Sequence, residues 1–240
     1  MTVAELPETF SSAAATTHRP APAHLDRAAR GAVAGAVAAV PPITVLHLSA
    51  TGPIEPAGWT ISDYVVSLPH GTLLFALTTG ALAIGAGALA HGLAPLPGTG
   101  RIRALLGLWA AGLLVAAVFP TNLRGTPANL SSEIHLYAGA VAFAGLPIAG
   151  ALLARWLGRT TGRGGWTAVL RCATVVSALL STALILNRLP GVIGMPQLML
   201  PPGVLQRVAG AAEIGLLAVA AIAVLRAGRP RVGDRWAPVR

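Results

Sequence analysis

Six long apolar stretches occupy most of this chain, and their length restricts what it can fold into. They run over residues 31–50, 68–93, 104–119, 134–154, 167–187 and 204–225. A helix of about 17–25 residues crosses the hydrocarbon layer of a bilayer, and it satisfies all of its backbone hydrogen bonds internally. The sequence therefore predicts an all-α, polytopic membrane protein built as a six-transmembrane-helix bundle.

The composition leaves little room for a separate soluble domain. Of the 240 residues, 54% are hydrophobic and 10% are charged, whereas soluble domains carry about 25% charged residues. We therefore expect one transmembrane domain over residues 31–226. Residues 1–30 are rich in Pro, Ser, Thr and Ala and lack the pattern of a signal peptide, so they predict a disordered cytoplasmic tail. Residues 227–240 predict a basic cytoplasmic tail.

The arginines predict the orientation of the bundle. All 17 basic residues are arginine. With both termini placed in the cytoplasm, 14 arginines lie on the cytoplasmic side: Arg19, Arg27, Arg30, Arg101, Arg103, Arg155, Arg159, Arg163, Arg171, Arg226, Arg229, Arg231, Arg235 and Arg240. The remaining 3 lie on the outer side: Arg124, Arg188 and Arg207. This bias follows the positive-inside rule and predicts a multi-pass protein of the cell membrane.

The same argument limits the partners that the chain is expected to have. The net charge of +9 is explained by topology, so we expect the lipid bilayer as partner and no nucleic acid. The single cysteine, Cys172, excludes an internal disulfide and a multi-cysteine metal site. His47, His70 and His135 form no closely spaced pair, so the sequence predicts no metal site and no cofactor.

Polar side chains gather near the predicted outer ends of the spans. The candidates for ligand binding or catalysis are Asp63, His70, Asn122, Glu133, His135, Asn187, Arg188, Gln206 and Glu213. Helical spacing places some of them on shared faces: Gln206 with Glu213, and Arg188 with a stripe of small hydroxyl residues at 174, 177 and 181. These hydroxyls often bond to their own backbone instead, and Asp63 is equally suited to capping a helix.

Glu213 is the most informative of these residues. It lies about ten residues into the last span, near the predicted midplane of the membrane. A carboxylate there is costly unless it is paired or hydrated, and intramembrane acids are commonly functional. We therefore expect Glu213 to face the bundle interior, either in a ligand pocket or in a structural pair with Arg188 or Arg207.

Three short motifs resemble those of a known family. Residues Ile61-Ser62-Asp63 precede the second span, Phe119-Pro120-Thr121-Asn122 follows the third, and His135 opens the fourth. In these motifs the chain resembles the DUF998 family of six-span bacterial membrane proteins over roughly residues 30–225. The resemblance implies the fold and topology, and it implies a bacterial source, but it assigns no activity.

Three functions are consistent with these residues. The first is a protein with an outward-facing polar pocket for a small or lipidic ligand, used in transport, sensing or an accessory role. The second is an intramembrane enzyme of lipid or isoprenoid chemistry, such as cyclisation or isomerisation. In it Glu213 would be the general acid, His135 or Asp63 the base, and Arg188 an oxyanion stabiliser. The third is a structural assembly partner.

Overall fold

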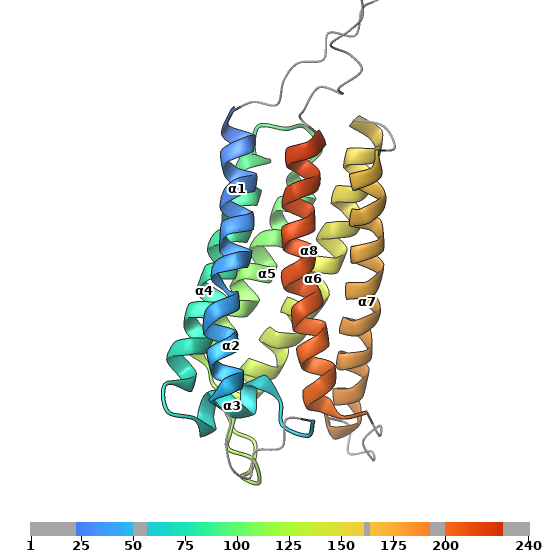
Figure 1. Ribbon diagram of the computed structural model, residues 1–240. Coiled ribbons are helices and arrows are strands. Elements are labelled where there is room, and N and C mark those ends of the chain that lie inside the picture. Colours follow the sequence, from blue (N-terminus) through green and yellow to red (C-terminus); the bar gives the residue numbers. More distant parts are fainter. Residues whose placement is uncertain (1–22, 50–56, 161–163, 193–199, 228–240) are drawn as a thin grey trace, which may run out of the picture.

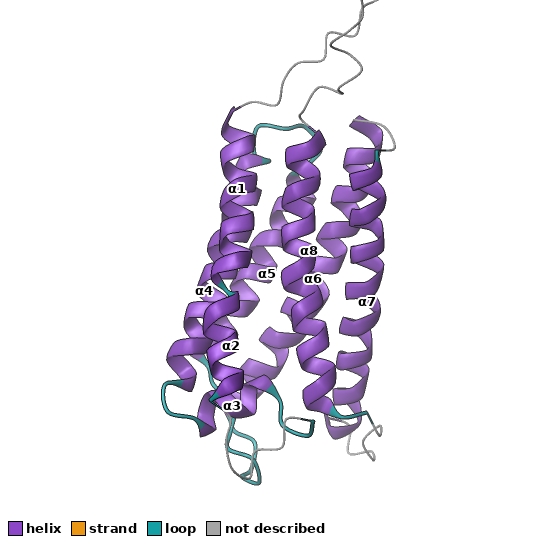
Figure 2. Cartoon of the chain, viewed as in Figure 1, coloured by secondary structure: helices purple, strands orange, loops and turns teal. Residues whose placement is uncertain are grey.

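The computed structural model describes residues 23–49, 57–160, 164–192 and 200–227, and this part of the chain is helical, without strands (Figure 2). The helices are α1 (Ala23–Ala38), α2 (Val40–Leu48), α3 (Ile61–Ser67), α4 (Gly71–Gly92), α5 (Gly100–Val118), α6 (Leu130–Thr160), α7 (Gly165–Val192) and α8 (Pro202–Ala227). Six segments are long and apolar enough to cross a membrane, with α1 and α2 together forming the first. The predicted all-α fold and its six spans are confirmed.

The first span begins earlier than its hydropathy indicates. Helix α1 starts at Ala23, inside the segment that the sequence assigns to a tail. Its first turns are held by packing, because Leu25 and Ala28 are buried against Gly92 at the end of α4. Arg30 also forms an ion pair with Asp26 on the exposed face, at 3.0 Å. The remainder of the predicted N-terminal tail and nearly all of the C-terminal one lie outside the described residues.

The six spans form a ring in chain order. Each span packs against the next, in the order α1, α4, α5, α6, α7 and α8, and α8 closes the ring by packing against α1. Helix α6 also contacts α8 across the ring. The start of α1 and the end of α8 lie at one end of the bundle, and the short helix α3 lies at the other (Figure 1). This α3 end of the bundle contains most of the polar side chains discussed below.

The first span is interrupted at Ala39, between α1 and α2. Pro41 and Pro42 follow in the first turn of α2, where a missing N–H is tolerated but where the preceding helix cannot continue regularly. Helix α1 packs against α8, whereas α2 packs against α4 and α3 and, within the described residues, makes no contact with α8. The interruption therefore separates the first and last spans at the α3 end.

Close packing in the other half of the bundle depends on small residues. A Cβ atom on Gly35 would lie 2.6 Å from the carbonyl oxygen of Ala81 and 2.8 Å from the Cα of Gly85. The backbones of α1 and α4 therefore touch at this point. In lipid, such close approach replaces the hydrophobic effect as the source of helix association. Gly215 of α8, in contrast, lies exposed with open space around its Cβ position.

Candidate functional site

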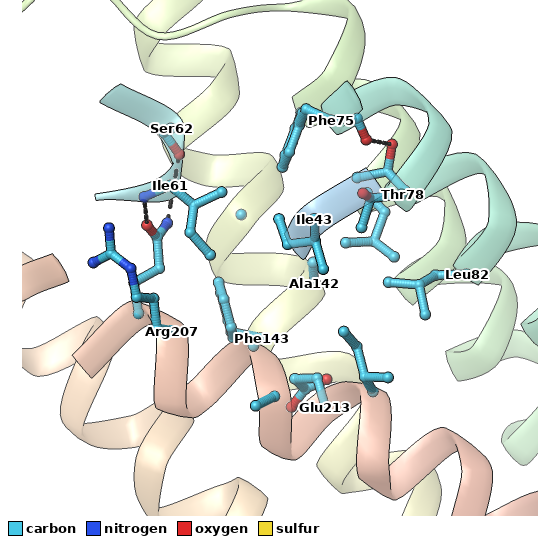
Figure 3. A pocket seen from close by; sticks show the side chains of 18 of the residues that line it. Ile43, Ile61, Ser62, Phe75, Thr78, Leu82, Ala142, Phe143, Arg207 and Glu213 are labelled. Atoms are coloured by element: carbon cyan, nitrogen blue, oxygen red, sulfur yellow. Dashed lines mark hydrogen bonds between the residues drawn. The ribbon is translucent and has the colours of Figure 1, made fainter. Parts of the chain in front are cut away.

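Two cavities at the α3 end of the ring share a wall. The first, of about 390 Å³, is lined by residues of α2, α3, α4, α5, α6 and α8 and is mostly apolar. We call it the apolar cavity; Phe75, Leu82, Leu113 and Ile214 represent its lining, and Glu213 lies on its wall. Figure 3 shows Ser62 and Glu213 toward opposite ends of this cavity, with Phe143 between them.

The second cavity, of about 320 Å³, lies against α3, α6, α7 and α8. We call it the charged cavity, because Asp63, Arg188 and His135 line it together with Gln206. Ser62, His135, Gly139, Phe143 and Gln206 line both cavities. The two spaces therefore adjoin along one polar and aromatic border.

The apolar cavity reaches the outer surface of the bundle between α2 and α8. Thr44 and Leu48 of α2 and Ala211 of α8 line the cavity and are exposed, Leu48 to 77%. These two helices do not touch within the described residues, since the interruption at Ala39 directs α2 away from α8. In a bilayer this surface faces acyl chains, so the opening is lateral.

Helix α3 is held at its N-terminus by a capping box. The Asp63 carboxylate accepts hydrogen bonds from the backbone N–H of Thr60 at 2.7 Å and from its hydroxyl at 2.8 Å, while the Asp63 N–H donates to the Thr60 hydroxyl at 3.3 Å. This is the reciprocal arrangement that satisfies the free N–H groups at a helix start. Asp63 is thus a cap of α3, and its side chain also lines the charged cavity.

A chain of hydrogen bonds joins four helices across the border of the two cavities. Gln206 of α8 accepts from the backbone N–H of Ile61 at 2.6 Å and donates to the hydroxyl of Ser62 at 3.4 Å. The Ser62 Oγ lies 2.8 Å from Nε2 of His135 on α6. Nδ1 of His135 lies 2.8 Å and 2.9 Å from the carbonyl oxygens of Ala116 and Phe119, at the end of α5.

These contacts determine the tautomer of His135. A carbonyl oxygen only accepts hydrogen bonds, so Nδ1 carries the proton. Nε2 of the neutral ring is then the acceptor for the Ser62 hydroxyl. The carbonyls of the last turn of a helix have no partner within that helix, and His135 supplies one for Ala116. The ring is therefore fixed in position from both sides.

Glu213 is held by three donors from two other spans. Its Oε1 accepts from Ser177 at 2.6 Å and Ser181 at 3.1 Å on α7, and its Oε2 accepts from the Trp109 ring N–H at 3.0 Å on α5. Glu213 is only 4% exposed. The ion pair with Arg188 or Arg207 that the sequence allowed is not formed, and serine and tryptophan donors replace it. Only Thr174 of the hydroxyl stripe bonds to its own helix, through Leu170.

The structure brings some of the predicted site residues together and leaves others apart. Arg188 lies on the charged cavity, and neighbouring Asn187 is buried and donates to the carbonyl of Leu200. Asn187 lines neither cavity. The same holds for His70 and Glu133, which are exposed, and for Asn122, which stabilises its own loop through Thr126. In the described part of the chain, no three His, Cys, Asp or Glu side chains are grouped as metal ligands.

Two residues of the site were not among those predicted. Ser62 lies on a seven-residue helix too short to give a periodic pattern, although it belongs to a motif that carries the family resemblance. Trp109 lies within an apolar stretch and reads as core, yet its ring N–H bonds to Glu213. A tryptophan in one membrane span of a bundle whose last span holds an acid was the available signal, since a buried indole N–H needs an acceptor.

The Gln206→Leu variant should release α3 from the bundle. The backbone N–H of Ile61 loses its acceptor and Ser62 loses a donor, which together should lower the free energy of unfolding by about 1–3 kcal/mol. Hydrogen–deuterium exchange should become faster in α3 and stay unchanged in α5. Gln206→Glu keeps the acceptor for Ile61, so it should have a smaller effect on exchange. Equal exchange of α3 in Gln206→Leu and the native protein would contradict this role.

The ring of six helices, each long and apolar enough to cross a membrane, defines a polytopic membrane protein. The chain matches the family model described as Protein of unknown function (DUF998) over residues 33–239, and it belongs to that family. Neither a curated protein nor a solved structure shows significant similarity to it.

Proposed function

We propose that this protein binds an amphipathic molecule whose hydrocarbon chain occupies the apolar cavity and whose polar head occupies the charged cavity. The observation that supports this most directly is the shared border: Ser62, His135, Gly139, Phe143 and Gln206 line both spaces. A single molecule can then extend from one cavity into the other. The cavity volumes fall in the range of about 300–1,000 Å³ typical of small-ligand sites, which favours a single-chain amphiphile.

The lateral opening supports the hydrophobic half of this proposal. An amphiphile dissolved in the bilayer reaches the apolar cavity between α2 and α8 without crossing water. Burial of its chain against Phe75, Leu82 and Leu113 replaces contacts with lipid tails, so chain burial alone gives little affinity. Selectivity is then set by the head group and by the polar border.

The charged cavity supports an anionic head group. Arg188 lines it, and in the described part of the chain its guanidinium makes no hydrogen bond and no ion pair within 4 Å. A guanidinium offers up to five donors in a planar fork that suits carboxylates and phosphates. Asp63 also lines this cavity, but its Oδ2 accepts a hydrogen bond from the backbone N–H of Thr60. Its carboxylate therefore makes the cavity wall polar and caps helix α3.

The arginine distribution supports an orientation in which both termini are cytoplasmic. Most arginines of the described helices lie at the end of the bundle where α1 begins and α8 ends, and Arg124, Arg188 and Arg207 lie at the other. Under the positive-inside rule, this orientation would put the two cavities at the outer side of the cell membrane. The ligand would be taken from the outer leaflet.

The Gly139→Leu variant tests the shared border. Gly139 lines both cavities, and a Cβ atom there would meet nothing within 4 Å, so the larger side chain fills cavity space without displacing the backbone. Binding of lysophosphatidylglycerol, measured by native mass spectrometry in detergent, should weaken by about tenfold or more, corresponding to roughly 1.4 kcal/mol. The thermal unfolding midpoint should change little.

Gly107→Leu is the matched control. Gly107 lies on the exposed face of α5, lines neither cavity and also has open space around its Cβ position. Lysophosphatidylglycerol should bind this variant as it binds the native chain. Equal binding by all three proteins, or no binding by any of them, would remove the proposal.

The alternative roles find less support. A general acid at Glu213 acting on an isoprenoid needs a carboxyl proton directed into the cavity, whereas three donors from Trp109, Ser177 and Ser181 point at its oxygens. A purely structural partner would need no paired cavities with a lateral opening. Ligand binding accounts for the cavities, the opening and the guanidinium together.

A further inference from the structure

We propose that Ser62 and His135 form a nucleophile–base pair that hydrolyses the acyl ester of the bound amphiphile. This inference rests on the binding function proposed above and names the chemistry of the same site. It starts from the contact of 2.8 Å between Ser62 Oγ and His135 Nε2. A nucleophilic hydroxyl within hydrogen-bond reach of a base that is itself oriented by a third group is the arrangement required for covalent catalysis.

The third group here is a pair of backbone carbonyls. The His135 Nδ1–H faces the carbonyl oxygens of Ala116 and Phe119, so Nε2 is free to accept the Ser62 proton. When the ring accepts this proton it becomes positively charged. The carbonyl oxygens at the C-terminal end of α5 carry partial negative charge and compensate that charge. Backbone carbonyls thereby take the part that a carboxylate plays in many serine hydrolases.

Ser62 also lies where a substrate ester would be. It lines both cavities, so a molecule with its acyl chain in the apolar cavity and its head in the charged cavity places the connecting ester at this border. Two donors near this border would stabilise the oxyanion. Gln206 Nε2 already donates to Ser62 Oγ at 3.4 Å, and Arg188 lines the charged cavity.

The reaction proceeds in two balanced steps. In the first, Ser62 Oγ attacks the ester carbonyl carbon and His135 Nε2 takes the hydroxyl proton. The bond from that carbon to the head-group oxygen then breaks, and the departing alcohol receives the proton from His135. In the second, water attacks the acyl-Ser62 ester while His135 takes a proton from the water. The bond to Ser62 Oγ then breaks, Oγ receives that proton from His135, and the free fatty acid leaves.

A long-chain fluorophosphonate tests the pair on the full chain in detergent micelles. The probe forms a bond between phosphorus and an activated serine oxygen and loses fluoride. Peptide mass spectrometry of the native chain should place the adduct on Ser62, a result that needs no variant. Ser62→Ala should abolish the adduct, and His135→Gln should slow its formation by about 100-fold or more, the contribution of a general base.

Ser131→Ala is the matched control. Ser131 also lies in the first turn of α6, but it lines neither cavity, and its hydroxyl donates to the carbonyl of Pro120. This variant should be labelled on Ser62 at the native rate and should release fatty acid from lysophosphatidylglycerol at the native rate. Ser62→Ala should bind that lipid and release none.

The outcomes separate the two proposals. Binding of lysophosphatidylglycerol without labelling of Ser62 would overturn the hydrolase and leave the binding function in place. Labelling of Ser62 without binding or hydrolysis of that lipid would support the nucleophile–base pair and overturn the proposed substrate class. An adduct on another serine, or native labelling rates in His135→Gln, would also overturn the pair.

Discussion

The Gly35→Val variant is expected to lose most of its folded population. The added Cβ would lie 2.6 Å from the Ala81 carbonyl oxygen and 2.8–2.9 Å from backbone atoms of Gly85. Backbone atoms of a helix have no alternative rotamer, so α1 and α4 must move apart. Because helix association in lipid depends on close packing, the separation should lower the free energy of unfolding by about 3 kcal/mol or more, the upper end of the range for overpacking.

The measurement is the thermal unfolding midpoint in detergent micelles, together with the fraction of monodisperse protein on size-exclusion chromatography. Gly87→Val is the matched control, because Gly87 lies on α4, the helix that Gly35 contacts, but has open space around its Cβ position. It should unfold close to the native midpoint. A Gly35→Val protein as stable as Gly87→Val would show that α1 and α4 are not in backbone contact.

The spans could be predicted from the sequence because the bilayer imposes one rule on every segment that crosses it. Length and hydropathy identified all six, and the interruption of the first coincides with the proline pair at residues 41 and 42. The start of α1 was missed because residues 23–30 are polar on one face, as Asp26 and Arg30 show. The first turns of α1 are stabilised by contacts with α4, and a hydropathy pattern does not reveal such contacts.

The site could be predicted in part. Periodicity identified the face of α8 that contains Gln206 and Glu213, and the serine stripe of α7. It did not show which neighbour each face meets, so the sequence left open whether Glu213 faces a ligand pocket or pairs with an arginine. The arginine of the same stripe, Arg188, lies instead on the charged cavity. The order of the helices around the ring determines which faces meet. That order depends on helix packing, which a single sequence does not specify.

The polar loops were the least predictable part of the site. Asn122 follows the third predicted span and Glu133 precedes the fourth, so both were candidates for ligand binding. Asn122 instead bonds within its own loop, and Glu133 is exposed. Helix α3 was not expected at all, since seven residues produce no measurable period. Its Thr60 and Asp63 fit the pattern of a capping box, and that local pattern was the available signal for it.

Removing both serines that bond to Glu213 is expected to destabilise the protein more than changing Glu213 itself. In the Ser177→Ala, Ser181→Ala double variant, Oε1 of Glu213 loses both donors while the group remains 4% exposed. Hydrogen bonds to a charged group contribute about 1.5–3 kcal/mol each, and an uncompensated buried charge costs about 3–5 kcal/mol. The free energy of unfolding should therefore fall by about 3 kcal/mol or more.

Glu213→Gln should cost less, because the amide can accept from Trp109 and donate to the two serine oxygens. Added to the double-serine variant, Glu213→Gln should restore at least half of the lost stability, since a neutral amide is less costly to leave without partners than a carboxylate. A thermodynamic cycle of the three proteins and the native chain isolates this coupling. A loss below about 1.5 kcal/mol in the double variant, with no recovery from Glu213→Gln, would show that Glu213 carries no charge in the bundle. Its three donors would then act as ordinary neutral contacts between α5, α7 and α8.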